Sequence, residues 1–159
     1  MKPRVLWIED SARLELRNLA APVYSSGRFD FNLAENVTSA VNLLKVTSFD
    51  AIVVDVRLPP GVDPYWKKLY QNAGADKVNA QLGIKLLHWL INKDHIIHPD
   101  DPPNGFSANQ LGVFTVENRE DIQDELDALG ISVFCQKTTG LPDAILIKIF
   151  DTIIDHKPM

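Results

Sequence analysis

Strand-forming and helix-forming stretches alternate five times along this sequence, and that alternation limits the possible folds more than any other feature. The strand-forming runs are short and rich in valine, isoleucine and phenylalanine, and helical apolar spacing follows each one. The run Phe49–Val56 has almost no polar face, which is typical of strands buried on both sides of a parallel sheet. We therefore predict an α/β fold, a parallel sheet with helices on both faces. The predicted strands are 5–8, 29–34, 49–56, 111–116 and 131–135, and the predicted helices are 11–24, 38–46, 81–92, 119–129 and 141–156.

Two segments stand outside the alternation. Residues 61–80 follow the third predicted strand, and residues 93–110, rich in proline, aspartate and asparagine, precede the fourth and are typical of a long surface loop. Asn118 is expected to cap the fourth helix, and Pro142 is expected to lie in the first turn of the last one. We predict a single domain over residues 1–157, with two insertions at about 61–80 and 93–110 and no output domain in this chain.

Composition narrows the class of protein. The formal net charge is -5 and the basic residues are scattered, which argues against a nucleic-acid-binding surface. The single cysteine, Cys135, allows no internal disulfide and fits a reducing compartment. The apolar run at the N-terminus is too short for a signal peptide or a membrane span. We expect a cytoplasmic protein.

Polar residues stand at the ends of the predicted strands. Glu9 and Asp10 follow the first strand, Asp55 lies at the end of the third, Thr115 at the end of the fourth, and Lys137 after the fifth. Because ligands of open parallel sheets bind outside the carboxyl ends of the strands, these side chains are expected to converge.

Three converging carboxylates require a cation. Like charges raise one another's pKa, and a hard divalent ion such as Mg²⁺ with oxygen ligands removes the conflict. Thr115 and Lys137 can then hold the oxygens of a phosphoryl group, and Asp55 can be the nucleophile that forms an aspartyl phosphate. Taken alone, Asp55 is better explained as the cap of the turn before Pro59 and Pro60.

The motifs VLWIEDS, AIVVDVRLPPG, FTVE and FCQKT together resemble those of response-regulator receiver domains, the phosphoacceptors of two-component signalling, also called the CheY-like superfamily. The resemblance covers nearly the whole chain except the two insertions. Asp55 follows Asp10 by 45 residues and Lys137 follows Thr115 by 22, both ordinary for the family. Thr115 follows Asp55 by 60 residues, roughly twice the usual interval, and the excess falls in the insertions. The resemblance implies a doubly wound, flavodoxin-like sheet of five strands in the order 2-1-3-4-5.

The resemblance also implies roles for individual residues. Asp55 would accept a phosphoryl group from the histidine of a kinase or phosphotransfer protein, and any catalysis would be limited to that transfer and slow autodephosphorylation. The implied Mg²⁺ ligands are Asp10, Asp55 and the backbone carbonyl of Arg57, with Glu9 acting mostly through water. The implied ligands of the phosphoryl oxygens are Thr115 and Lys137. The implied switch residues are Thr115 and Phe134, and Phe134 matches the aromatic residue that swings inward when the threonine moves.

Several residues depart from the family pattern. Val116 stands where the family prefers alanine or glycine, and its branched side chain is expected to narrow access to Asp55. Thr138 follows Lys137 in place of the usual proline with its cis bond, so the Lys137 loop is expected to be built differently. Arg57 and Glu117 flank the path of an attacking water and can pair across the site. We predict that Arg57, Val116 and Glu117 slow dephosphorylation.

Other functional interpretations stay open at this point. A phosphorylation-independent pseudo-receiver would use the same fold as a protein-interaction module, with a vestigial acidic site. A haloacid-dehalogenase-like phosphatase fits poorly, because Arg57 stands where that chemistry needs a second acid. His95 and His98 form only a loose pattern for zinc, and a solvated loop explains them better.

The surfaces of two helical segments also allow alternatives. The last predicted helix has more apolar residues than one buried face needs, so either the inserted segments cover it or it forms a dimer or partner surface. Tyr65, Trp66, Leu69 and Tyr70 of the first insertion have helical spacing. Either they pack onto the domain as a lid near Asp55 or they present aromatic anchors to a partner, and packing is the favoured alternative.

Overall fold

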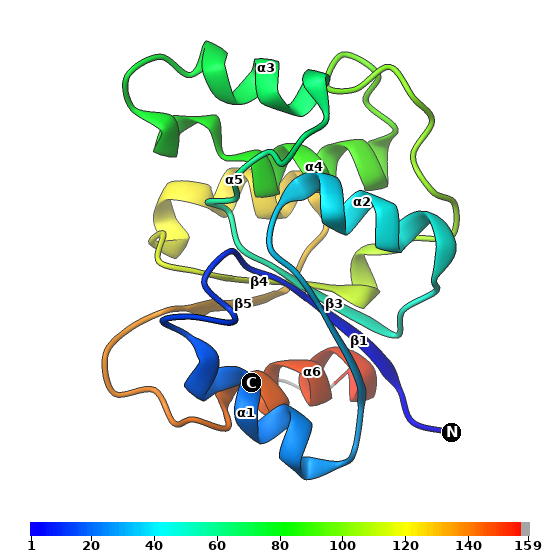
Figure 1. The fold of residues 1–159 in the computed structure, drawn as a ribbon, viewed down its shortest axis with the longest axis vertical. Coiled ribbons are helices and arrows are strands. Elements are labelled where there is room, and N and C mark those ends of the chain that lie inside the picture. Colours follow the sequence, from blue (N-terminus) through cyan, green and yellow to red (C-terminus); the bar gives the residue numbers. More distant parts are fainter. Residues whose placement is uncertain (157–159) are drawn as a thin grey trace.

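A five-stranded parallel sheet forms the centre of the molecule (Figure 1). The computed structural model describes residues 1–156, with the backbone alone at 77–78, so the predicted domain end at Lys157 lies outside the described residues. The strand order is β2-β1-β3-β4-β5, as the resemblance implied, and every neighbouring pair is parallel. The strands are β1 (Arg4–Ile8), β2 (Asp30–Ala34), β3 (Ala51–Val54), β4 (Leu111–Thr115) and β5 (Val133–Gln136).

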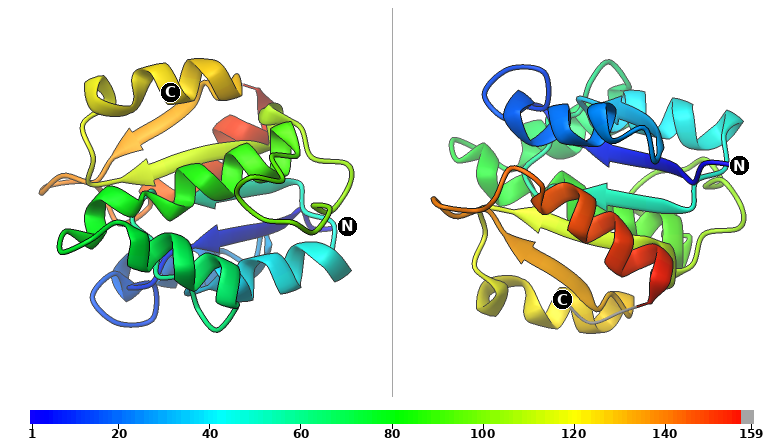
Figure 2. Two further views of the ribbon diagram at one scale, coloured as in Figure 1. Left: turned by 90° about the horizontal axis from the view of Figure 1, so that it is seen from above. Right: turned by 90° about the horizontal axis from the view of Figure 1, so that it is seen from below.

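Helices cover both faces of the sheet (Figure 2). One apolar cluster lies between the sheet and α2, α4 and α5, and a second lies between the sheet and α1 and α6. The central strands β3 and β4 are fully buried, in agreement with their apolar sequences, whereas the edge strand β5 is half-buried. The helices are α1 (Arg17–Ser26), α2 (Val37–Val46), α3 (Pro64–Asn72), α4 (Leu82–Asn92), α5 (Arg119–Leu129) and α6 (Ile145–Asp155), and the short 3₁₀ helices are η1 (Lys77–Ala80) and η2 (Ala108–Gln110).

The first helix begins later than predicted. The prediction began it at Ser11, but residues 11–16 form turns in which the amides of Leu14 and Leu16 both bond to the carbonyl of Ser11. Pro22, expected to mark the end region of the helix, lies inside α1. Residues 11–16 instead form part of the wall of the pocket described below.

One predicted helix-terminal role is confirmed only in its position, and another is wrong. Asn118 is the N-cap residue of α5 but makes no side-chain cap bond, because its Oδ1 accepts from Gln136 Nε2 at 2.9 Å. Pro142 precedes α6 by three residues, and its carbonyl accepts the amide of Ile145, the first residue of the helix.

The two insertions pack together on the outside of α4. In Figure 1, α3 lies beyond α4 as seen from the sheet, and the loop that leaves α4 returns past the start of α3. Trp66 of α3 is buried, edge-on to Trp89 of α4 at 5.7 Å between ring centroids. His98 of the second insertion is also buried, 5.5 Å from the Trp66 ring and 5.3 Å from the Trp89 ring. The first insertion therefore packs onto the domain through Trp66, while Tyr65 stays largely exposed.

The body of the fold covers most of α6. Phe150 lies 5.7 Å from the ring of Phe29 and 5.9 Å from that of Phe31, both at the neighbouring edge of the sheet. The alternative in which the inserted segments cover this helix is therefore largely wrong, since the apolar cluster around α6 is formed by residues of the sheet, α1 and their connections. The residues of α6 left partly exposed include the apolar Ile147 and Ile154.

No helix within residues 1–156 combines the length and the apolar character that crossing a membrane requires.

Candidate functional site

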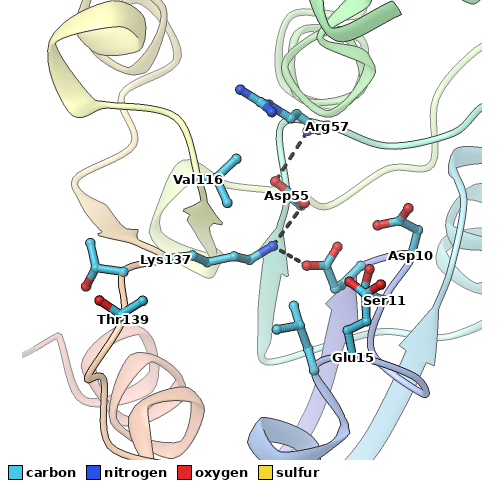
Figure 3. Close-up of a pocket in the computed structure, with 11 residues that line it drawn as sticks. Asp10, Ser11, Glu15, Asp55, Arg57, Val116, Lys137 and Thr139 are labelled. Atoms are coloured by element: carbon cyan, nitrogen blue, oxygen red, sulfur yellow. Dashed lines mark hydrogen bonds and ion pairs between the residues drawn. The ribbon is translucent and has the colours of Figure 1, made fainter.

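The predicted site residues meet at the carboxyl edge of the sheet. Because all five strands are parallel, the residues that follow β1, β3 and β5 emerge side by side around a pocket of about 470 Å³ (Figure 3). The lining residues are Glu9, Asp10, Ser11, Glu15, Leu16, Asp55, Arg57, Val116, Lys137, Thr138 and Thr139.

Lys137 connects the acidic residues of this pocket. Its side chain runs from the end of β5 toward β3 and β1 (Figure 3), where Nζ donates to Asp55 Oδ2 at 3.0 Å and forms an ion pair with Glu9. The Lys137 amide donates to the Thr115 carbonyl at 2.7 Å, which extends the β4–β5 pairing up to the site. Only 11% of the Lys137 side chain is exposed, so its charge acts on both carboxylates with little screening by water. The peptide bond that follows is trans, because the described part of the chain contains no cis bond.

The environment of Glu9 disfavours the charged form of its side chain. It is 1% exposed, and its Oε2 has no hydrogen-bond partner. Burial, and then the neighbouring Asp55, raise the pKa of Glu9 from 4.5 to about 8, against the opposing effect of Lys137. An unpaired buried carboxylate oxygen is costly, so this atom is suited to interact with a cation or its water shell.

The carboxylates fit a magnesium site. Glu9, Asp10 and Asp55 each offer an oxygen, and these three atoms lie within 4.8 Å of one another. Asp10 is exposed, so an ion can enter from solvent. The Arg57 amide donates to Asp55 Oδ1 at 3.3 Å, which brings the backbone of the proposed carbonyl ligand to the same carboxylate. Oxygen donors of this kind are those that Mg²⁺ prefers, and the unpaired Glu9 Oε2 supports the fit.

Two of the residues that depart from the family pattern, Arg57 and Val116, line the pocket. Arg57 Nε donates to Glu117 Oε1 at 2.8 Å, so the pair anticipated from the sequence forms in the structure. Val116 lines the pocket and is 44% exposed. In Figure 3 the Val116 side chain faces Asp55 from the end of β4.

Two predicted switch residues lie outside the pocket. Thr115 is fully buried and does not line the pocket, and its hydroxyl accepts the Glu117 amide at 3.4 Å. Phe134 is half-buried, with the guanidinium of Arg119 lying 5.6 Å from its ring centroid. The roles of Thr115 and Phe134 remain predictions.

Five lining residues were not predicted. Ser11, Thr138 and Thr139 are neighbours of Asp10 and Lys137 in the sequence, so their adjacency could have identified them. Glu15 and Leu16 had no such signal, because their stretch was predicted to be helical.

The histidines of the second insertion do not form a metal centre. His95 pairs with Asp101 at 2.8 Å, whereas His98 Nε2 lies 3.2 Å from Asp63 Oδ2. Within residues 1–156, the only metal-ligating side chains that gather closely enough, three or more together, to share an ion are those of Glu9, Asp10 and Asp55.

Comparison with known proteins relates this geometry to one fold. No protein-family model matches the sequence, and no curated protein matches it. Solved structures do match. A CheY-like receiver domain from Methanospirillum hungatei aligns with a TM-score of 0.61 at 13% identity, covering 98% of this chain and 96% of that one.

Two further structures give the same result. A response regulator from Thermotoga maritima aligns with a TM-score of 0.60 at 15% identity, over 98% of this chain and 99% of its own. The signal receiver domain of a putative Luxo repressor from Vibrio parahaemolyticus has a TM-score of 0.62 at 17% identity, over 98% and 92%. The chain has the fold of the CheY-like receiver domains of response regulators.

Proposed function

We propose that this chain is a receiver whose Asp55 accepts a phosphoryl group from the phosphohistidine of a kinase or phosphotransfer protein, in a Mg²⁺-dependent reaction. The observation that carries the proposal is the position of Lys137, whose ammonium group contacts both Asp55 and Glu9 at the wall of an open pocket. Such an arrangement can hold a dianionic phosphoryl group beside a carboxylate nucleophile. The proposed cellular location is the cytoplasm, in keeping with the single unpaired cysteine.

The transfer needs little chemistry from the side chains beyond positioning. An oxygen of Asp55 attacks phosphorus, the bond from phosphorus to the donor imidazole nitrogen breaks, and the imidazole leaves as neutral histidine after taking up a proton. Mg²⁺, when bound by Glu9, Asp10, Asp55 and the Arg57 carbonyl, would offset the charge of the phosphoryl oxygens. Lys137 exchanges its contact with Asp55 for one with a phosphoryl oxygen.

Phosphorylation is proposed to change the conformation through Thr115. Its hydroxyl must leave the Glu117 amide, 3.4 Å away, to reach a phosphoryl oxygen. Phe134 of the neighbouring strand β5 is the half-buried aromatic residue expected to respond. The partly exposed Ile147 and Ile154 of α6 are the residues that a homodimer through the last helix would use.

The test is intact-protein mass spectrometry after incubation with Mg²⁺ and a phosphodonor. Acetyl phosphate and a phosphohistidine protein should be used in parallel, since Val116 is expected to hinder small donors. The wild type should gain one phosphoryl group, and the Asp55→Asn variant should gain none. A folded wild type that gains nothing from either donor would favour the phosphorylation-independent interaction module, which the buried position of Thr115 also fits.

The residues at the pocket mouth are proposed to set the lifetime of the aspartyl phosphate. Val116 would hinder the approach of water to Asp55. Arg57, which pairs with Glu117, lines the same pocket and would restrict the same approach. We expect the Val116→Ala variant to accept phosphoryl groups from acetyl phosphate and to lose them about threefold to tenfold faster, as measured by the decay of the phosphorylated mass. Unchanged rates in both directions would show that Val116 does not control access.

A further inference from the structure

The chain that follows Asp55 is hydrogen-bonded to the N-terminus of α2. The amide of Val37 donates to the carbonyl of Pro59 at 3.0 Å, and the amide of Thr38 donates to that of Pro60 at 3.1 Å. Helix N-termini leave their first amides without partners inside the helix. Here the loop after the phosphoacceptor supplies those partners, so the position of the loop and the start of α2 depend on each other.

The side chain of Thr38 adds two more bonds to this junction. Its hydroxyl donates to the Pro60 carbonyl at 2.7 Å and accepts the amide of Asp63 at 3.1 Å. Gly61 lies between these two bonds with φ of 79°, and a Cβ there would come within 2.7 Å of Thr38 and 2.4 Å of Asn36 Oδ1. The loop therefore packs directly against the start of α2, with no room for a side chain at Gly61.

Only a short span separates this junction from the site. Val56 is buried and its carbonyl accepts the amide of Gly83 at 3.0 Å, while Leu58 is buried next to Pro59. Arg57 thus lies between two backbone hydrogen bonds, one that joins Val56 to α4 and one that joins Pro59 to α2. Its amide contacts Asp55 Oδ1, and its carbonyl is the proposed Mg²⁺ ligand. A shift of the loop at either hydrogen bond is therefore expected to move the backbone of Arg57.

We propose that Thr38 is a positioning residue for the metal site: its hydroxyl fixes the loop that holds the Arg57 backbone beside Asp55. The proposal rests on the proposed function, because it assumes that Mg²⁺ binds there. Groups placed by supporting hydrogen bonds lose affinity when that support is removed, even where they keep their own ligands.

The same hydroxyl also links the insertions to the site. Asp63, whose amide Thr38 accepts, caps α3 through bonds from the amides of Tyr65 at 2.8 Å and Trp66 at 3.3 Å. Its second oxygen accepts from Nε2 of His98, since the Asp100 amide donates to Nδ1 of that ring. The junction at Thr38 therefore joins α2, the phosphoacceptor loop and both inserted segments.

The test compares Mg²⁺ binding by the wild type, Thr38→Val, Thr38→Ser and Thr152→Val, measured by titration calorimetry. Valine keeps the shape of threonine and removes the hydroxyl, and serine keeps the hydroxyl. Thr152 is a matched control, because it is a buried threonine of α6 whose hydroxyl bonds to Lys148 on the opposite face of the sheet. We expect Thr38→Val to bind Mg²⁺ about fivefold more weakly, and the other two variants to bind within about twofold of wild type.

A second readout does not depend on metal. In the metal-free protein, the amide resonance of Arg57 should shift in Thr38→Val and stay in place in Thr152→Val. Equal Mg²⁺ affinity for Thr38→Val and wild type, or an equal loss in both valine variants, would overturn the positioning role. A wild type that binds no Mg²⁺ would overturn the proposed function and this role together, and the Arg57 resonance would then report whether the loop depends on Thr38.

Discussion

Replacing Gly83 by alanine should destabilise the protein by about 3 kcal/mol or more, although the residue lies in a helix where alanine is normally favoured. A Cβ on Gly83 would lie 1.9 Å from the carbonyl oxygen of Asp55 and 2.9 Å from the Cα of Val56. Both neighbours are backbone atoms, so no side-chain rotation relieves the clash. The first turn of α4 must move away from the end of β3, and urea unfolding measures the cost.

The control for this variant is Gly74→Ala. Gly74 has φ of 78°, and no atom lies within 4 Å of the place that a methyl group would take, so alanine there costs only the left-handed conformation, about 1 kcal/mol. Helix propensity alone predicts the reverse order, with Gly83→Ala more stable than wild type by up to about 1 kcal/mol. A Gly83→Ala protein as stable as wild type would show that α4 does not pack this closely against the backbone of Asp55.

Removing the ammonium group of Lys137 from the site should also lower the stability of the protein strongly. The metal-free Lys137→Met variant leaves Glu9 and Asp55 without their shared partner, and we expect it to unfold about 3 kcal/mol more easily than wild type near pH 9, above the raised pKa of Glu9. Near pH 5 the loss should be much smaller, because the raised pKa of Glu9 keeps that carboxyl protonated in both proteins. Urea unfolding in a chelator at the two pH values measures the difference.

The direction of the pH effect in the wild type follows from the same shift. The folded-state pKa of Glu9, about 8, lies above its ordinary value of 4.5. The stability associated with the protonated group is therefore complete below pH 4.5 and is lost as the pH rises toward 8. The Glu9→Gln substitution should flatten this slope, and combined with Lys137→Met it should recover much of the lost stability. A Lys137→Met loss that is the same at pH 5 and pH 9 would contradict this electrostatic account.

The sheet could be predicted because its strands are short apolar runs separated by helical spacing. Parallel strands buried on both faces leave little choice of element type, so the order of the five strands and, apart from the starts of α1 and α6, the positions of five helices were predicted correctly. The start of α1 could not be predicted. Residues 11–16 are good helix formers, but Ala12 is buried in the core and two amides bond back to Ser11, and such tertiary contacts override helix propensity.

The part of the site formed by residues at the ends of strands could be predicted from the sequence. Glu9, Asp55 and Lys137 follow directly on strands, so the topology alone brings them together. The side-chain direction of Thr115 was not predictable, because a hydroxyl at a strand end can face the pocket or the following amides. The aromatic spacing of the first insertion indicated its helix, but its burial against His98 depends on a loop that lies far away in the sequence.

The measurement that tests the central claim most directly is the location of the phosphoryl group. After incubation with a phosphohistidine protein, with Mg²⁺ or with a chelator, the protein is digested with trypsin, and the fragment 46–57, VTSFDAIVVDVR, is sequenced by mass spectrometry. The account predicts one phosphoryl group on Asp55, none on Asp50, and a large reduction in the chelated sample. Phosphorylation elsewhere in the chain, or equal modification without a divalent ion, would contradict it.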